Sequence, residues 1–136
     1  MRIAALDVGE ARVGVAVSDE LGITAQGIAV VRRVGGQRDL EALAAVLAPY
    51  TPERLVVGLP LSLNGSEGPQ AAKVRAFAAR VAAHLGLPLE FCDERLTTVA
   101  AERVLREGNV GPRRRRAVVD KVAATLILQT YLARRP

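Results

Sequence analysis

Acidic side chains occur at three places in this sequence where packing favours apolar residues. Asp7 ends an apolar run that begins at Ile3, and Asp93 and Glu94 directly follow a second run. Asp120 lies near the start of a C-terminal helical pattern, on the flank of its apolar stripe. Carboxylates gathered from separate elements repel one another unless cations intervene, and Mg²⁺ prefers oxygen ligands. Two such ions can hold the attacking water and the leaving oxygen of a phosphodiester.

Each acid also has a purely structural interpretation. Asp7 could accept hydrogen bonds from the amides of the turn that follows it. One of the two acids at positions 93 and 94 could pair with Arg95 or cap the next helix. Asp120 could interact with a helix N-terminus or pair with a neighbouring arginine. The spacing of the acids therefore leaves the reaction open.

The order of apolar patterns predicts the elements that position these acids. Strands are expected at residues 2–8, 12–19, 27–33, 55–58 and 87–92. Helices are expected at about residues 40–47, 69–85, 99–106 and 117–133, with a turn-rich stretch at 59–69 and a polar segment at 107–116. This order predicts one three-layer α/β domain, residues 1–136, around a mixed five-stranded sheet. Ligands of such sheets bind beyond the carboxyl ends of the strands.

Composition excludes several classes of function. Of 136 residues, half are apolar, and no 18-residue apolar run or signal peptide is apparent, so we expect a cytoplasmic protein without a membrane anchor. One cysteine, Cys92, permits no internal disulfide, and with only His84 beside it no zinc cage can form. His84 falls off the apolar stripe of its helix and is expected to be solvated, which argues against Ser-His-Asp catalysis.

The charge balance favours a polyanionic partner. The net charge is +5, and 17 of the 19 basic residues are arginine, whose planar fork matches phosphate. Only four aromatic residues are present, two Phe and two Tyr, so base stacking is not expected to dominate nucleic-acid binding. Many small basic proteins bind no nucleic acid, however, so charge alone does not decide the partner.

Four motifs resemble those of the YqgF/RuvX family of Holliday junction resolvases, also regarded as pre-16S ribosomal RNA nucleases. They are DVG at 7–9 with RVGVAVSD at 12–19, VGLP at 57–60 with NGSEGP at 64–69, CDERLTT at 92–98, and DKVAA at 120–124 with LQ at 128–129. The resemblance implies a ribonuclease H-like fold, in agreement with the element order. It also implies a nuclease that uses Mg²⁺ or Mn²⁺, held by Asp7, Glu94 and Asp120, with Asp93 as a neighbouring acid of undetermined role.

The resemblance also gives roles to polar residues around this acid site. Asp7 would bridge two metal ions, and the stretch 59–69 would approach the substrate backbone. The residues expected to contact nucleic acid are Arg12, Asn64, Ser66, Arg95, Arg113, Arg114, Arg115, Arg116 and Lys121. The arginine run at 113–116 could equally be a solvated connector. Glu10 departs from the family pattern, and its charge could either help to hold a metal or weaken the approach of phosphate.

Two other functions remain open from the sequence. The spacing of Asp7, Gly9 and Gly14 also occurs in the phosphate-binding turn of the actin, sugar-kinase and Hsp70 superfamily, but that fold needs two such domains. A non-catalytic module that binds RNA or DNA during ribosome maturation would keep its affinity without the acids. A resolvase makes two symmetric nicks, for which a homodimer would be expected. The sequence does not choose between RNA and DNA, or between endo- and exonucleolytic cutting.

Overall fold

A five-stranded mixed sheet forms the centre of the protein. The computed structural model describes residues 1–62, 64–94 and 112–134, with 112–120 described by their backbone only. The strands are β1 (Ile3–Val8), β2 (Arg12–Ser18), β3 (Ala25–Arg32), β4 (Arg54–Leu59) and β5 (Leu89–Asp93), in the order β3-β2-β1-β4-β5. The first three strands form an antiparallel meander, whereas β4 and β5 add in parallel to β1. This confirms the predicted mixed sheet.

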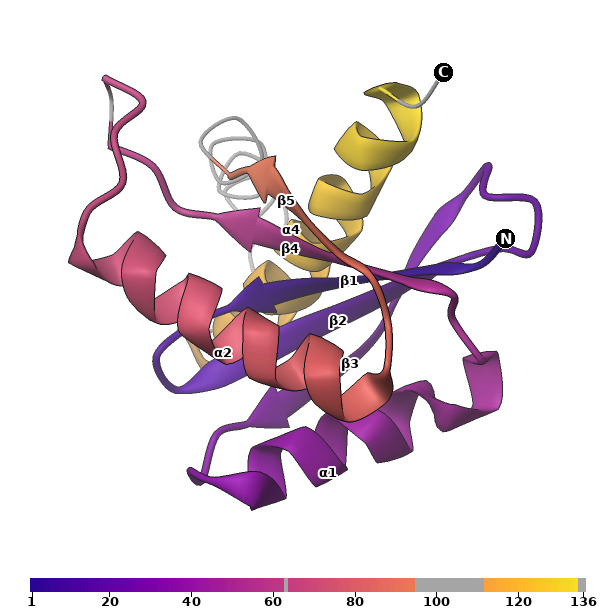
Figure 1. Cartoon of the computed structure of the whole chain (residues 1–136), viewed down its shortest axis with the longest axis horizontal. Helices are drawn as coiled ribbons and strands as arrows, with labels where there is room; N and C mark the ends of the chain where they lie inside the picture. Colours follow the sequence, from indigo (N-terminus) through magenta and orange to yellow (C-terminus); the bar gives the residue numbers. More distant parts are fainter. Residues whose placement is uncertain (63, 95–111, 135–136) are drawn as a thin grey trace.

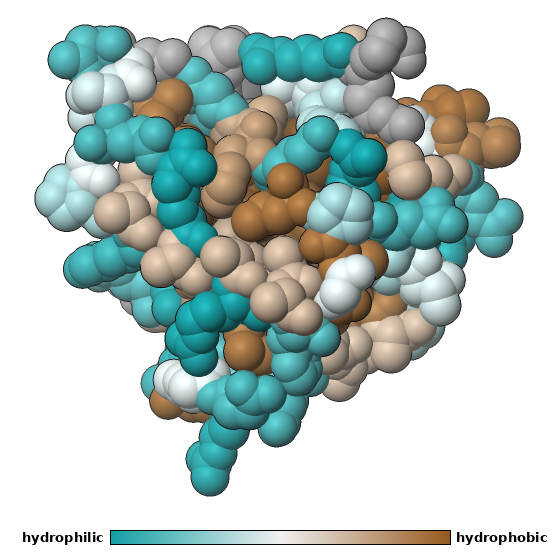
Figure 2. Space-filling view, in the orientation of Figure 1, coloured by the Kyte–Doolittle hydropathy of each residue, from teal (hydrophilic) through white to brown (hydrophobic). Residues whose placement is uncertain are grey.

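The helices cover both faces of this sheet (Figure 1). On one face lie α1 (Gln37–Leu47), a 3₁₀ turn η1 (Ala48–Tyr50) and α2 (Pro69–Leu85). The other face is covered by α4 (Pro112–Arg134). Connections that return to a parallel strand need a crossover, and α1 and α2 supply the crossovers into β4 and β5. Over α2, Figure 2 shows pale brown interspersed with teal, because the exposed residues of this helix include alanines as well as charged side chains.

Two hydrophobic cores follow from the two-residue period of the strands. On one face, Ala4, Leu6 and Val8 of β1 pack with Leu43 of α1 and Phe77 of α2. On the opposite face, the buried side chains are Ile3, Ala5, Ala16, Val56, Cys92, Ala124, Ile127 and Leu128. The central strands are buried on both faces, which explains why they appear in the sequence as almost continuous apolar runs.

The helix boundaries differ from the sequence prediction in two places. Helix α4 begins at Pro112, five residues before the predicted start, so the arginine run 113–116 is helical and is not part of a polar connector. Proline suits the first turn of a helix and arginine is a good helix former, so the polarity of this segment did not indicate the start of the helix correctly. Helix α1 begins at Gln37, three residues before the predicted start, and ends at Leu47 as predicted; the 3₁₀ turn η1, which contains Pro49, follows it. The helix predicted at 99–106 lies outside the described residues.

Helix α4 lies close to the sheet because glycines occur beneath it. A Cβ atom on Gly27 of β3 would lie 3.0 Å from Oγ1 of Thr125 and 3.2 Å from the carbonyl oxygen of Lys121. A Cβ atom on Gly58 of β4 would lie 2.5 Å from Cδ1 of Ile127. The helix therefore crosses the sheet from β3 to β4 at a distance that larger residues would not allow.

Candidate active site

Asp7 is the polar residue on an otherwise apolar strand. Along β1, Ile3 and Ala5 belong to the core beneath α4, and Leu6 and Val8 belong to the core beneath α2. Alternation therefore puts Asp7 on the α4 face of the sheet. Its side chain is partly exposed at the carboxyl end of β1, although its neighbours on the strand are buried. An acid at the end of a central strand is well placed to contact a ligand beyond the sheet edge.

The same alternation separates the two neighbouring acids after β5. Cys92 faces α4 in the core, so Asp93 falls on the opposite face and Glu94 returns to the α4 face. The backbone of Glu94 continues the pairing with β4, since its amide donates to the carbonyl oxygen of Leu59 at 3.2 Å. Glu94, and not Asp93, therefore shares a face with Asp7.

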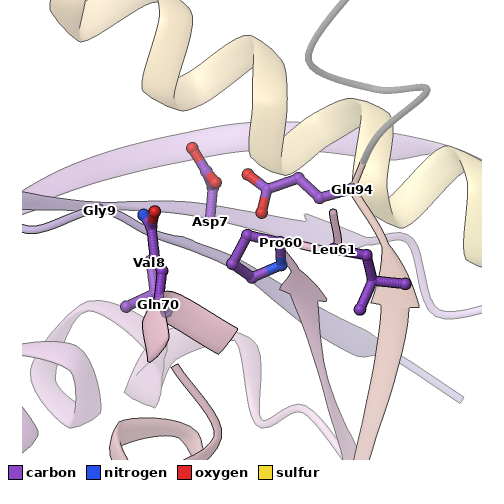
Figure 3. A pocket seen from close by; sticks show the side chains of 7 residues that line it. All are labelled: Asp7, Val8, Gly9, Pro60, Leu61, Gln70 and Glu94. Carbon is purple, nitrogen blue, oxygen red and sulfur yellow. The ribbon is translucent and has the colours of Figure 1, made fainter. Parts of the chain in front are cut away.

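A pocket of about 330 Å³ joins Asp7 and Glu94. Its lining residues are Asp7, Val8, Gly9, Pro60, Leu61, Gln70 and Glu94. Figure 3 shows Glu94 extending toward Asp7 from the end of β5, which is separated from β1 by β4, with α4 passing beside both. Pro60 follows β4 directly, so the carboxyl ends of all three parallel strands border this pocket. The two carboxylates facing each other there supply the oxygen donors that a hard divalent cation requires.

The third predicted acid, Asp120, lies in the helical backbone of α4, and its side chain is outside the described part of the structure. The buried face of α4 includes Ala123, Ala124, Ile127 and Leu128. This face is rotated from the predicted stripe, in which Val122 and Leu126 were expected to pack; both are only partly buried. Among the side chains that the structure describes, no group of three acids, histidines or cysteines forms a metal site.

The loop between β4 and α2 folds into a small hairpin beside the pocket. Leu61 pairs with Glu67, and the amide of Ser62 donates to the carbonyl oxygen of Ser66 at 2.9 Å. Oδ1 of Asn64 accepts hydrogen bonds from the amide of Ser66 at 3.0 Å and from its Oγ at 2.7 Å. Both predicted nucleic-acid contacts on this loop therefore also stabilise its turn.

Arg75 of α2 links this loop to β5. Its Nη2 donates to Oε2 of Glu67 at 3.0 Å, and its Nε donates to Oε1 of the same carboxylate. The guanidinium also lies over the ring of Phe91, 4.6 Å from the centroid. The hydrogen bonds from Arg75 hold the pKa of Glu67 below its ordinary value. Arg75 thus contacts both the loop that carries Leu61 and the strand that leads to Glu94, a role that the sequence analysis did not find.

A second polar cluster fixes the turn after Asp7. Arg33 Nη1 donates to the carbonyl oxygen of Gly9 at 2.9 Å, and its guanidinium lies 4.3 Å from the centroid of Phe77. Asp39 is buried and accepts hydrogen bonds from the amides of Val34 at 2.8 Å and Gly35 at 3.1 Å. A Cβ atom on Gly9 would lie only 2.9 Å from the carbonyl oxygen of Arg12, so this tight turn requires glycine.

The remaining predicted contacts lie in different parts of the structure. Arg12 begins β2 and is partly buried, and Arg95 lies outside the described residues. The arginines Arg113, Arg114, Arg115 and Arg116 lie in the first turns of α4, with side chains outside the described part. Lys121 is exposed and lines a separate groove with Gly27 and Thr125. The structure thus groups Asp7 with Glu94 and does not group Lys121 with them.

His84 and Cys92 show no features of a nucleophile or metal ligand. His84 is exposed in the last turn of α2, as expected, where its Nδ1 lies 3.3 Å from Nε2 of Gln37. Cys92 is buried, and this burial raises the pKa of its thiol, which disfavours the reactive thiolate. No helix in the described residues is long and apolar enough to cross a bilayer.

Comparison with known sequences extends along nearly the whole chain. A relative from Moorella thermoacetica, named "Putative pre-16S rRNA nuclease", is 58% identical over 134 residues, covering 98% of this chain and 96% of the relative. A relative of the same name from Symbiobacterium thermophilum is 54% identical over 132 residues, covering 97% of this chain and 92% of the relative.

Solved structures show the same fold at low sequence identity. A Thermus thermophilus RuvC in complex with a Holliday junction substrate has a TM-score of 0.57 at 22% identity, covering 98% of this chain and 96% of that chain. The fowlpox virus resolvase in complex with Holliday junction DNA has a TM-score of 0.59 at 12% identity, covering 98% and 97%. These neighbours confirm the expected ribonuclease H-like architecture. The model of the family described as "RuvX: Holliday junction resolvase" matches residues 1–134, and the chain therefore belongs to that family.

Proposed function

We propose that this protein is a metal-dependent nuclease that hydrolyses phosphodiester bonds in structured or precursor nucleic acid. The observation that carries this proposal is the convergence of Asp7 and Glu94, 87 positions apart, on one pocket at the carboxyl ends of the parallel strands. The family description and the names of the relatives support two substrates, a Holliday junction and pre-16S ribosomal RNA. Nucleic acid is also the polyanion that the +5 net charge favours.

The carboxylates of Asp7 and Glu94 fit Mg²⁺ or Mn²⁺ better than a softer metal. Both donors are oxygen atoms, and the described lining of the pocket contains neither cysteine nor histidine. Two carboxylates that face each other repel, and a bound cation relieves this repulsion. The open pocket leaves room for a phosphate oxygen and for the waters that Mg²⁺ retains.

Asp120 is the third acid of the proposed site. Helical spacing puts it one turn before Ala123 and Ala124, which are buried against the sheet, and two turns before Ile127, which packs on Gly58. Position 120 belongs to the same helical row as these buried residues, which supports its assignment to the face of the sheet that carries Asp7. Because α4 lies close to the sheet, a residue one turn before these alanines is expected near the carboxyl ends of the strands.

The reaction follows from this set of residues. A pair of bound divalent ions would activate water and stabilise the negative charge on the departing oxygen. The water oxygen bonds to phosphorus, the bond to the 3′ oxygen breaks, and the products carry a 5′ phosphate and a 3′ hydroxyl group. Asp7, Glu94 and Asp120 would hold the ions, and the loop between β4 and α2 would border the path of the substrate backbone. Two symmetric cuts in a junction would require two copies of this site, so we expect a homodimer on that substrate.

Single substitutions of the acids test the proposal. We expect Asp7→Asn, Glu94→Gln and Asp120→Asn each to abolish Mg²⁺- or Mn²⁺-dependent cleavage while thermal unfolding stays cooperative. Asp93→Asn is the matched control, because it removes a neighbouring charge from the opposite face of the sheet. Cleavage of a four-way DNA junction and of an extended 16S 5′ leader RNA should be measured in parallel, with EDTA as the blank.

Two results would contradict the proposed site. Cleavage that survives in both Asp7→Asn and Asp120→Asn would show that the chemistry lies elsewhere. A wild-type protein that binds the junction or the leader with salt-sensitive affinity, but never cuts either, would support the non-catalytic binding module instead.

A further inference from the structure

A small recess adjoins the proposed metal pocket on the α2 side of the sheet. It has a volume of about 30 Å³ and is lined by Val8, Gly9, Glu10, Arg33, Gln70, Lys73 and Val74. Val8, Gly9 and Gln70 line both cavities, so the recess opens beside the two carboxylates. A ligand group bound in this recess would therefore lie next to the phosphodiester bond that is cut.

The two basic side chains of the recess, Arg33 and Lys73, differ in their interactions with the rest of the protein. Arg33 is occupied by the carbonyl oxygen of Gly9, the ring of Phe77 and the carboxylate of Asp39 at 3.9 Å. Lys73 is exposed on α2 and forms no ion pair with any residue in the described part of the chain. Its ammonium group is therefore available to an anionic ligand.

The size of the recess limits the ligand. A volume of about 30 Å³ accommodates one or two water-sized atoms, far less than the neighbouring pocket of about 330 Å³. A strand whose scissile phosphate lies between Asp7 and Glu94 carries its next phosphate within one nucleotide. Non-bridging phosphate oxygens are the part of such a strand that is both small and negative.

We propose that Lys73 binds a backbone phosphate next to the scissile one, and that Glu10 in the same recess weakens this contact. The proposal rests on the nuclease function proposed above and adds a phosphate subsite to it. It also gives Glu10 a position, since Glu10 lines the recess with Lys73 and is absent from the described lining of the metal pocket. Its carboxylate opposes a phosphate there and is not one of the metal ligands.

Binding measurements on uncut probes test this subsite. The substitutions are made on an Asp7→Asn background with Mg²⁺ present, and Kd for a fluorescent four-way junction and for the 16S leader RNA is measured by anisotropy across salt concentrations. We expect Lys73→Gln to weaken binding several-fold and to reduce the slope of log Kd against log salt by about 0.9 for duplex, as the loss of one phosphate contact requires. Glu10→Gln should strengthen binding.

Arg80→Gln is the matched control. Arg80 is exposed on the same helix, seven residues and two turns beyond Lys73, so it lies on the same helical face but outside the recess. We expect it to change Kd and the salt slope less than Lys73→Gln. Equal effects of the two substitutions would show that Lys73 contributes only as one of many surface charges, and the proposed subsite would be wrong.

The remaining outcomes separate this subsite from the proposed function. If the wild-type protein cuts but Lys73→Gln leaves Kd and the salt slope unchanged, the subsite alone is wrong. If Glu10→Gln raises the Mg²⁺ concentration needed for half-maximal cleavage in the otherwise wild-type protein, Glu10 is a metal ligand and its assignment here is wrong. If the wild-type protein neither binds nor cuts either probe, the proposed function fails together with the subsite.

Discussion

The carboxyl group of Glu94 lies against Gly58, in space that a side chain at position 58 would reduce. The carboxyl carbon of Glu94 lies 3.5 Å from the position that a Cβ atom on Gly58 would occupy, and Cδ1 of Ile127 lies 2.5 Å from that position. Helix α4 and the candidate acid therefore both use the space left by one missing side chain. The close approach of α4 to the carboxyl ends of the strands follows from a glycine at this position.

Adding one methyl group at Gly58 should lower the stability of the fold. We expect Gly58→Ala to destabilise the fold by about 1–3 kcal/mol, because the new Cβ overlaps with Ile127. Urea unfolding measures this loss. Ile127→Val removes the clashing Cδ1, so the double variant should be more stable than the sum of the two single effects predicts. Strict additivity would contradict the packing. Gly68→Ser, in open space at the start of α2, should change stability little.

The ion pair between Arg75 and Glu67 should be visible in a titration. Hydrogen bonds from Arg75 lower the pKa of Glu67, so the pair stabilises the loop above pH 4.5 and loses this effect as the pH falls through the lowered pKa. We expect Arg75→Gln to return the pKa of Glu67 toward 4.5, followed by carboxyl ¹³C NMR. Amide exchange at Ser62 and Gly65 should also become faster. An unchanged Glu67 titration would show that the pair does not form in solution.

Asp39 should be important for stability although it lies outside the pocket. Its buried carboxylate accepts two backbone hydrogen bonds, and Asp39→Ala would leave the amides of Val34 and Gly35 without this acceptor. We expect a loss of about 1–3 kcal/mol in the free energy of unfolding. Glu41→Ala, an exposed acid on the same helix, should have a much smaller effect. Similar losses from both substitutions would argue for a general effect on α1.

A polar cluster links the C-terminal half of α4 to the sheet. Arg54 Nη1 donates to Oε1 of Glu90 at 2.7 Å and lies 3.4 Å from the hydroxyl group of Tyr131. Burial, followed by its hydrogen bond to Glu90, raises the pKa of Tyr131, so the neutral phenol is favoured in the folded state. The resulting stabilisation is complete below pH 10 and is lost as the pH rises through the raised pKa.

Removing the charge of Glu90 should lower this pKa. We expect Glu90→Gln to move the phenol pKa toward 10, and ultraviolet absorbance during alkaline titration measures the change. The signal of Tyr131 can be separated from that of Tyr50, whose ring lies beneath the guanidinium of Arg2, by repeating the titration with Tyr50→Phe. A titration that Glu90→Gln leaves unchanged would contradict the link between Tyr131 and Glu90.

The sequence predicted the five strands and the three helices that the structure describes, and it singled out the candidate acids. Uninterrupted apolar runs such as the one from Ile3 to Leu6 predicted central strands, because a strand that is buried on both faces has no polar side to show. The stripe through Val74, Phe77 and Val81 predicted α2 from its helical period. Asp7 was conspicuous because nothing in the packing of β1 explains an acid there.

Only the tertiary structure decided which neighbouring acid faces Asp7. The family resemblance implied Glu94, but the local pattern alone could not separate it from the adjacent Asp93, because a shift of one residue in register reverses the face of every side chain. The pairing of this segment with β4 is what puts Glu94 on the face of Asp7. The position of Glu10 likewise depends on contacts between distant elements, because the turn between β1 and β2 lines the recess together with Lys73 of α2. Local pattern fixes periodicity along one element, whereas the face and the neighbours of a side chain depend on contacts between elements that are far apart in the chain.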